Sequence, residues 1–274
     1  MLHKKITFIG AGNMATSIIS GLVKDGYPSD LICASEPNIA NTQKLADKYA
    51  VKTSQDNNQA TQWADVIVLS VKPQIMPAVC QDLAEQGIDF SQKLIISIAA
   101  GISVQRLHSL LGENSAIVRT MPNTPSLLKK GMTGLFASQQ VTDADKAFAG
   151  ELMAAVGETL WVEDEAMINA VIAASGSSPA YFFLFMEAMQ EKAMEMGFTE
   201  QQARLLVQQA ALGSAEMVKE NSEISLATLR ENVTSKGGTT AEAVRTLNEL
   251  TLKETVAKAM QAAADRGVEM EKLF

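Results

Sequence analysis

The chain has little of the chemistry on which most metal and thiol centres depend. It holds two cysteines and two histidines among 274 residues. A disulfide framework needs more cysteines, and structural metal sites draw mainly on cysteine and histidine. Cys33 and Cys80 also fall in segments with the pattern of a strand and a helix. We therefore expect a reducing, cytoplasmic setting and no bound metal, and we interpret His3 and His108 as surface or capping residues.

Positive charge is also scarce. Lysine and arginine number 23 against 31 acidic residues, which leaves a net charge of −8. Contacts to nucleic-acid phosphates need a basic surface, so the charge balance argues against a nucleic-acid partner. Residues 1–5 lead directly into a predicted strand with no long apolar region, so we expect no signal peptide. No apolar run approaches the length of a membrane span. The sequence thus predicts neither a nucleic-acid nor a membrane partner.

What the chain does have is a glycine-rich turn between a strand and a helix. Residues 5–10 read Lys-Ile-Thr-Phe-Ile-Gly, a strand pattern whose centre is β-branched and aromatic, and the turn Gly10-Ala11-Gly12-Asn13-Met14-Ala15 begins at its last residue. In a dinucleotide site of this pattern the first glycine makes the tight turn and the second lets the pyrophosphate approach, while the small third residue lets the helix pack on the strand. The motif predicts a nucleotide site, and a glycine-rich turn without a ligand is the alternative.

The next strand, residues 31–34, ends where the choice between NAD and NADP is normally made. Ser35 and Asn38 offer donors to a 2′-phosphate, whereas Glu36 would repel one if it pointed inward. The signals conflict, and we interpret the balance as favouring NADPH, with NADH also accepted.

Two further apolar strands, residues 66–71 and 94–98, end at Lys72-Pro73 and at Ala99-Ala100-Gly101. Ligands bind at the carboxyl edge of open α/β sheets, so both strand ends are candidate cofactor contacts. Lys72 either flanks the cofactor or is a solvated lysine at a strand end. Strands and helices alternate up to about residue 162, which predicts a doubly wound, Rossmann-like α/β domain over residues 1–163.

Beyond residue 163 the pattern is helical throughout. We expect an all-α domain over residues 164–274, with a break at residues 175–179 and Pro179 in the first turn of the helix that follows. The helix 179–196 carries an apolar face too large for water, including Phe182, Phe185 and Met189. Such a surface predicts a homodimer through this domain.

One loop in the helical half combines glycines with hydroxyl side chains. Residues 232–240 read Asn-Val-Thr-Ser-Lys-Gly-Gly-Thr-Thr, and a helix starts at Thr239. Helix N-termini present free N–H groups and a positive dipole end, which suit a small anion such as a carboxylate. An ordinary helix–helix turn is the alternative.

Together these segments resemble one family, the Δ1-pyrroline-5-carboxylate reductases, in collinear order over nearly the whole chain. The matching motifs are Gly10-Ala11-Gly12-Asn13-Met14, Val71-Lys72-Pro73, Arg119-Thr120-Met121-Pro122-Asn123-Thr124-Pro125, Ser175-Gly176-Ser177-Ser178-Pro179-Ala180-Tyr181 and Val233-Thr234-Ser235-Lys236-Gly237-Gly238-Thr239-Thr240. The resemblance implies hydride transfer from NAD(P)H to 1-pyrroline-5-carboxylate to give L-proline. It also implies a homodimer, and larger rings that are pentamers of dimers, or decamers.

The resemblance also implies roles for single residues. The implied cofactor contacts are Gly10, Ala11, Gly12, Asn13 and Met14 at the pyrophosphate, Ser35 and Asn57 at the adenosine ribose and its phosphate, and Val71, Lys72, Pro73, Ala99, Ala100 and Gly101 on the nicotinamide side. Asn232 touches cofactor or product. The implied substrate contacts are the backbone of Gly238, Thr239 and Thr240, with Glu165 and Glu223 nearby. The Thr240 hydroxyl reaches the ring nitrogen and Ser235 supports it. Many relatives have proline at Lys236 and near Leu226, so the loop's shape is the point where this chain departs from the family.

The residue chemistry agrees with an imine reductase. An iminium ion already carries its proton, so a held carboxylate, a positioned hydroxyl and a hydride donor suffice. A β-hydroxyacid dehydrogenase is the second hypothesis. Its chemistry needs an ionisable group at the substrate hydroxyl, and the run 180–185 holds no lysine. A nucleotide-sensing protein without turnover is the third, because fold alone does not settle function.

Overall fold

The computed structural model describes residues 3–273. The chain divides into two compact units, one of Met1–Ser177 with Ala262–Phe274 and one of Ser178–Gln261. These units are defined by compactness. The boundary expected after residue 163 separates a cofactor-binding from a substrate-binding domain, and it stays a prediction.

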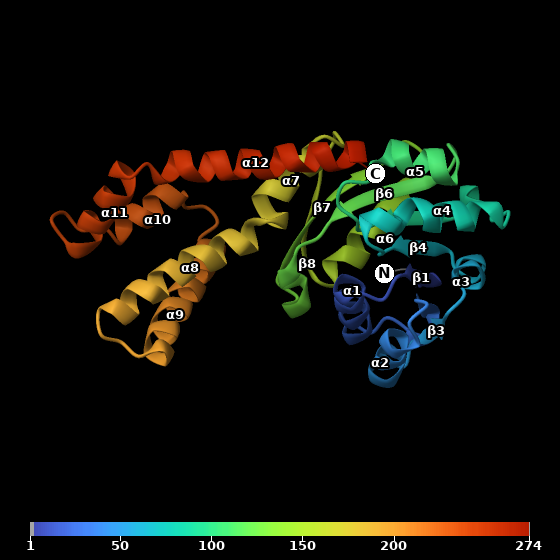
Figure 1. Ribbon diagram of the computed structural model, residues 1–274, viewed down its shortest axis with the longest axis horizontal. Coiled ribbons are helices and arrows are strands. Elements are labelled where there is room, and N and C mark those ends of the chain that lie inside the picture. Colours follow the sequence, from blue (N-terminus) through green and yellow to red (C-terminus); the bar gives the residue numbers. More distant parts are fainter. Residues whose placement is uncertain (1–2, 274) are drawn as a thin grey trace. The chain divides into compact units, whose positions relative to one another are not determined.

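An eight-stranded sheet organises the first unit (Figure 1). Its strands are β1 (Ile6–Ile9), β2 (Ile32–Ser35), β3 (Lys52–Ser54), β4 (Val66–Leu69), β5 (Leu94–Ser97), β6 (Ala116–Met121), β7 (Gly131–Ala137) and β8 (Gly157–Trp161). They lie in the order β3-β2-β1-β4-β5-β6-β7-β8. Strands β1 to β6 are parallel, β7 runs antiparallel to β6, and β8 is parallel to β7. The strand order reverses between β1 and β4, which defines the switch point where such sheets bind ligands.

Helices cover both faces of this sheet. They are α1 (Asn13–Lys24), α2 (Ile39–Tyr49), α3 (Asn57–Trp63), α4 (Met76–Glu85), α5 (Val104–Leu111), α6 (Asp143–Ala154) and α7 (Met167–Val171). One apolar core joins α1, α2 and α6 to one face, and a second core joins α4 and α5 to the other. Because both faces are covered, the central strands are apolar throughout, as the sequence pattern indicated.

The α/β class with a helical second part is confirmed, with one strand missed. Strand β3 carries the residues Lys52, Thr53 and Ser54, of which two are exposed. It lies at the edge of the sheet beside β2. An edge strand buries little surface, so it leaves no apolar run in the sequence.

The break expected at residues 175–179 is a π-helical turn, Ile172–Gly176, which follows α7 directly. Pro179 is then the second residue of α8 (Ser178–Glu195), where the missing N–H of proline costs nothing. The π-turn carries the small residues Ala173, Ala174, Ser175 and Gly176. Such turns are frequent at functional sites.

The second unit is built of helices, with α8 and α9 (Glu200–Glu220) side by side (Figure 1). Helix α9 begins with a capping box in which Thr199 and Gln202 satisfy each other's backbone N–H groups. Helices α10 (Leu226–Asn232) and α11 (Thr239–Glu249) flank the hydroxyl-rich loop, and α12 (Leu252–Leu273) ends the described chain. The last turns of α12 belong to the first unit.

Helix α8 has no buried residue in the isolated chain. Phe182, Phe183, Leu184 and Phe185 follow one another on it with exposed fractions of 46–67%. By length and composition the stretch Met167–Glu195 could also cross a membrane, with a mean hydropathy of 1.3, which the sequence pattern had not indicated. A helix with this much apolar surface needs a cover, and another protein chain supplies one as well as lipid does.

Candidate functional site

The glycine-rich turn lies at the switch point of the sheet. Gly10 has φ of +101° and donates its N–H to the carbonyl of Ser35 at 2.8 Å. The Ser70 hydroxyl, just after β4, donates to the carbonyls of Ile9 and Gly10 at 2.9 and 2.8 Å. A Cβ at Gly10 would lie 2.7 Å from the Ser70 carbonyl oxygen. Only glycine combines this φ with so close an approach, so the turn is fixed by its neighbours.

The start of α1 is open to a ligand. Gly12 is the N-cap residue, and no side chain caps the helix there. A Cβ at Gly12 would meet no atom within 4 Å, and Gly12 and Asn13 are exposed. Ala15, by contrast, is buried in the core beneath β1. Free N–H groups, open space and a positive dipole end are what a pyrophosphate requires.

Two candidate ribose contacts, 22 residues apart, meet in the structure. The Ser35 hydroxyl at the end of β2 donates to the Asn57 Oδ1 atom at the start of α3, at 2.7 Å. Ser35 is fully buried, whereas Asn57 is partly exposed. The hydrogen bond fixes the Asn57 amide, which is partly exposed, at the end of β2.

Glu36 points toward the glycine-rich turn. Its Oε2 atom accepts the N–H of Ala11 at 2.9 Å. The Oδ1 atom of Asn38 caps α2 by accepting the N–H of Ala40 at 3.1 Å, and this bond does not use the Nδ2 donors that a phosphate would need. A carboxylate in this position accepts hydrogen bonds from ribose hydroxyls and repels a 2′-phosphate.

The nicotinamide-side candidates follow β4 and β5, which are neighbours in the sheet. Lys72 is exposed, and Pro73 opens a short 3₁₀ turn before α4. In the next connection Ala99 and Gly101 are buried, Gly101 with φ of +74°. The structure therefore brings both candidate segments to one edge of the sheet.

The hydroxyl loop of the second unit contains a tight turn. The N–H of Gly238 donates to the carbonyl of Ser235 at 3.0 Å, and Gly237 between them has φ of +73°. A Cβ at Gly238 would lie 2.5 Å from the Ser235 hydroxyl oxygen. The N–H of Gly238 is thus already used, so the N–H groups of Thr239 and Thr240 are the next candidates for binding a ligand.

Those amides open helix α11. Gly238 is its N-cap residue with an extended backbone, and no side chain caps the helix. Thr239 and Thr240 are exposed, and first-turn N–H groups have no acceptor within a helix. Asn232, the last residue of α10, is also exposed. The loop therefore offers main-chain donors and hydroxyls together.

Glu165 lies in the first unit and has partners there. Its Oε1 atom accepts a hydrogen bond from Nη1 of Arg119 and another from the N–H of Val104, both at 2.8 Å. The same Nη1 lies 2.8 Å from Oε1 of Glu271. The sequence pattern alone assigned no role to Arg119 or Glu271. A charged residue inside the apolar strand Ile117-Val118-Arg119-Thr120 was the available signal, since a buried charge requires partners.

The cysteines and histidines are structural. Cys33 and Cys80 are buried free thiols, and burial raises the pKa of both, that of Cys80 to about 12. His108 Nε2 lies 3.0 Å from the Ser115 carbonyl oxygen, and His3 stacks edge-on against Tyr27. Across residues 3–273, no three His, Cys, Asp or Glu side chains gather as a metal site would need.

A doubly wound sheet with an open glycine-rich turn at its switch point defines the class of dinucleotide-binding α/β proteins. Residues 5–101 match the family model described as NADP oxidoreductase, coenzyme F420-dependent. Residues 165–270 match the model for pyrroline-5-carboxylate reductase dimerisation.

Full-length relatives specify the family. A pyrroline-5-carboxylate reductase of Vibrio alginolyticus is 61% identical over 274 residues, the whole of both chains. The structure of such a reductase from Coxiella burnetii has a TM-score of 0.93 and 43% identity, and the match covers 98% of this chain and 99% of that one. One from Plasmodium falciparum with NADP bound has a TM-score of 0.87 and 28% identity, covering 99% of each chain. The chain belongs to the pyrroline-5-carboxylate reductase family, and it is an NAD(P)H-dependent oxidoreductase.

Proposed function

We propose that this protein transfers a hydride from NADPH to the imine carbon of 1-pyrroline-5-carboxylate and releases L-proline. The uncapped start of α11, with Thr239 and Thr240 exposed on it, carries the substrate assignment. The full-length similarity to proteins named for this reaction supports it. The bound cofactor supplies the hydride, and the chain's residues bind, orient and protect the reacting groups.

The cofactor contacts lie in the first unit. The N–H groups of Gly12, Asn13 and Met14 at the start of α1 would hold the pyrophosphate, because no side chain caps that helix. Gly10 and Ala11 would line the same turn, with their N–H groups already donated to the Ser35 carbonyl and to Glu36. Ser35 and Asn57 would meet the adenosine ribose through the amide that their hydrogen bond orients. The segments 71–73 and 99–101 would line the nicotinamide.

NADPH remains the proposed preferred donor, with NADH also used. The NADP-bound relative and the NADP oxidoreductase family model support the preference. The direction of Glu36 weakens it, because the carboxylate that accepts the Ala11 N–H lies beside the expected position of the 2′-phosphate. Selection against NADH is therefore expected to be modest.

The substrate contacts lie in the hydroxyl loop. The amides of Thr239 and Thr240 would receive the carboxylate, with the Gly238 N–H held in the turn that shapes the loop. The Thr240 hydroxyl would meet the ring nitrogen, and Ser235, packed against Gly238, would keep that helix start in place. Asn232 would contact cofactor or product from the end of α10.

Glu165 is the proposed substrate contact that already has hydrogen-bond partners within the chain. Its Oε1 atom already accepts from Arg119 and Val104, and its side chain is 24% exposed. We propose that its carboxylate favours the protonated iminium, because a negative charge beside a cation stabilises the cation. Glu223, exposed in the turn before α10, is the corresponding candidate in the second unit.

No general acid of matched pKa is required. The protonated imine brings its own proton, and hydride addition leaves a neutral ring nitrogen that the Thr240 hydroxyl can donate to. Rate enhancement would come from orientation and from exclusion of water, which contribute most when the reacting atoms are held in contact distance.

We propose that residues 164–274 form the dimerisation and substrate domain of a homodimer. The match of residues 165–270 to the dimerisation model and the exposed apolar surface of α8 support it. The same surface accounts for the membrane-compatible hydropathy of Met167–Glu195 without a membrane. A ring of five dimers is the proposed higher assembly, and the cytoplasm, which keeps Cys33 and Cys80 reduced, is the proposed location.

Oxidation of NADPH and of NADH, followed by absorbance with racemic 1-pyrroline-5-carboxylate, tests the proposal. Rapid turnover with L-proline as product is the expected result. NADPH binding without turnover would refute the proposed reaction in favour of a nucleotide sensor. The ratio of the two rates measures the cofactor preference.

A further inference from the structure

A buried arginine joins three elements of the first unit. Arg119 lies in β6 with a side chain 1% exposed, and its Nη1 atom is 2.8 Å from Oε1 of both Glu165 and Glu271. Glu165 precedes α7, and Glu271 lies in the last turn of α12. Burial of a charge is costly unless it is paired, so the three groups hold one another in place.

The Glu165 carboxylate and Met270, the neighbour of Glu271, both contact the connection between β5 and α5. Glu165 Oε1 also accepts the N–H of Val104, the first residue of α5, at 2.8 Å. Met270, next to Glu271, packs on Gly101: a Cβ at Gly101 would lie 2.7 Å from the Met270 Cβ. Residues 101–104 are therefore held from two sides, by Glu165, which pairs with Arg119, and by Met270, whose neighbour Glu271 pairs with Arg119.

We propose that Arg119, acting through Glu165 and Glu271, is a positioning residue for the nicotinamide ring. The inference rests on the proposed function, in which residues 99–101 line the nicotinamide. Hydride transfer depends steeply on the donor–acceptor geometry, and a displacement of about 1 Å can cost roughly a hundredfold in rate. A loop held at both ends restricts that displacement.

The position of the Arg119 guanidinium depends on both carboxylates, so loss of either one should disturb it. Its Nε and Nη2 atoms are buried and have no hydrogen-bond partner within residues 3–273, so Nη1 makes both ion pairs. Asn169 fixes the second carboxylate by donating to Oε1 of Glu271 at 3.1 Å. Removal of Glu271 leaves the guanidinium held from one side only and frees the end of α12 that covers Gly101.

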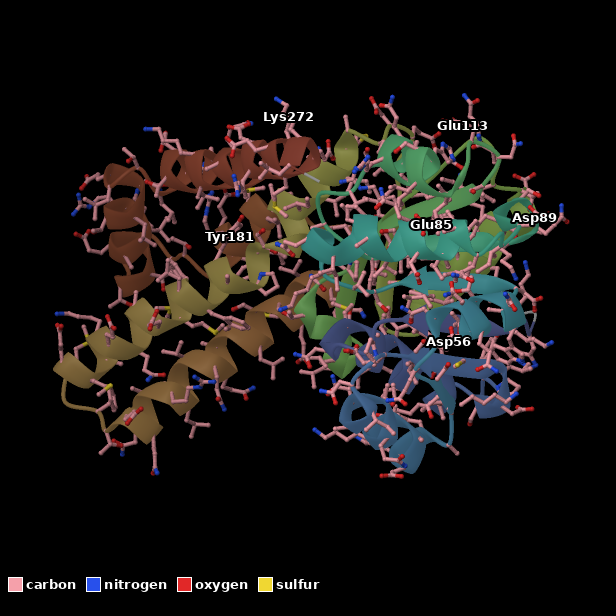
Figure 2. The ribbon with its side chains drawn as sticks, turned by 45° about the vertical axis from the view of Figure 1, so that its right-hand side comes forward. Asp56, Glu85, Asp89, Glu113, Tyr181 and Lys272 are labelled. Atoms are coloured by element: carbon pink, nitrogen blue, oxygen red, sulfur yellow. The ribbon has the colours of Figure 1, made fainter. Side chains whose placement is uncertain are left out.

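Glu271→Ala tests this role with the full chain, and Glu269→Ala is the matched control. Glu269 is two residues away on α12, exposed, and paired with Arg266 on the same helix. Lys272, between these carboxylates and the chain end, projects away from the ribbon into solvent (Figure 2). The control therefore removes a carboxylate from the same helix end without touching Arg119.

We expect kcat of Glu271→Ala to fall by about five- to tenfold with KM for pyrroline-5-carboxylate unchanged. The deuterium isotope effect on kcat, with the transferred hydrogen of NADPH labelled, should rise because hydride transfer becomes more rate-limiting. Glu271→Gln should recover more than half of the lost kcat, since its amide oxygen still accepts from Arg119 and Asn169. Glu269→Ala should match the unsubstituted protein.

Binding of two ligands separates positioning from general loosening. Glu271→Ala should bind NADPH about fivefold more weakly and bind 2′-phospho-ADP-ribose, which lacks the nicotinamide, with unchanged affinity. An equal loss for both ligands, or a kcat and isotope effect equal to those of Glu269→Ala, would overturn the inference. This comparison needs no imine, so a failure of the unsubstituted protein to reduce pyrroline-5-carboxylate would refute the proposed function and leave the positioning result readable.

Discussion

Thr239 and Thr240 are neighbours at the start of α11, yet the proposed site uses them differently. Thr239 contributes its main-chain N–H, whereas Thr240 contributes its N–H and its hydroxyl. Loss of a hydroxyl that bonds the developing amine costs about 1–3 kcal/mol. Thr240→Ala should therefore lower kcat by roughly ten- to a hundredfold while NADPH affinity, measured by fluorescence titration, stays unchanged.

Thr239→Ala is the control for that measurement. It keeps the main-chain donor and the uncapped helix start, so its kcat should remain within about threefold of the unsubstituted value. Unchanged turnover in Thr240→Ala would refute the assigned role. Equal losses in both variants would point to a change in the helix start rather than to the hydroxyl.

The charge of Glu36 is expected to influence the choice between NADPH and NADH. Glu36→Gln keeps an oxygen that can accept the Ala11 N–H, but it removes the negative charge beside the expected 2′-phosphate. Two like charges about 4 Å apart repel by about 1 kcal/mol even in water. The ratio of kcat/KM for NADPH to that for NADH should therefore rise by about fivefold or more. A fall or no change in this ratio would show that Glu36 does not face the phosphate.

The thiols give a prediction from titration. Burial raises the pKa of Cys80 to about 12 and also raises that of Cys33. Each thiol is therefore protonated and unreactive at pH 8 in the folded protein, because the thiolate is the nucleophile. Iodoacetamide at pH 8 should label neither residue until the protein is denatured, and rapid labelling of the native protein, read by mass spectrometry, would contradict this.

The sequence reveals some of these residues and not others for a physical reason. Gly10 and Gly12 are readable because a strand–turn–helix with this spacing has few uses. The meeting of Ser35 with Asn57, and the turn of Glu36 toward Ala11, depend on how β1, β2 and α3 lie beside one another. Side-chain direction at a strand end is set by that packing and leaves no pattern along the chain.

Among the elements, the turn of the hydroxyl loop has a geometry that fits both the Lys236 of this chain and the proline that many relatives carry there. Ser235 and Gly238 close a turn in which Gly237, at the third position, has positive φ. Turns of this kind favour proline at the second position, which Lys236 occupies. Leu226 is likewise the first residue of α10 after its Ser225 cap, a position that accepts proline. The turn therefore keeps its geometry with lysine and accepts proline as well.

Lys236→Pro should stabilise the protein for that reason. Proline in a compatible turn restricts the unfolded chain and adds about 0.4–1 kcal/mol to the free energy of unfolding. Gly237→Ala is the opposite test, because a left-handed conformation costs a non-glycine residue about 1–2 kcal/mol. Urea unfolding should show the two midpoints displaced in opposite directions, and destabilisation by Lys236→Pro would contradict the turn assignment.

The elements themselves were predictable where burial is two-sided or periodic. The strands of the sheet's centre carry unbroken apolar runs because helices cover both faces. The polar edge strand β3 and the π-turn Ile172–Gly176 have no such signature. The pairing of β7 antiparallel to β6 was also out of reach, because strand direction depends on the path of the connection rather than on strand composition.

For the whole molecule, the sequence and the isolated chain point to the same surface. The apolar run in α8 indicated an interface, and the structure leaves that helix without a buried residue. Arg119 and Glu271, which are 152 positions apart (271 − 119), show the reverse case. Only the folded chain brings them together. The charge of Arg119 within an apolar strand therefore predicts that an acidic partner exists, but the sequence does not show which residue it is.

The last prediction concerns assembly. Phe182 and Phe185 are 67% and 46% exposed, and burial of each side chain contributes about 1.5–3 kcal/mol. Replacing both by aspartate removes four apolar side chains from a symmetric dimer and places charges there instead. The double variant Phe182→Asp, Phe185→Asp should therefore sediment as a monomer, whereas the unsubstituted protein should sediment well above 29.4 kDa.

Leu128→Asp is the control, since Leu128 is 78% exposed in the first unit and its substitution should leave the assembly intact. An unsubstituted protein that is monomeric at micromolar concentration would refute the interface, and a dimer that survives both aspartates would place it elsewhere.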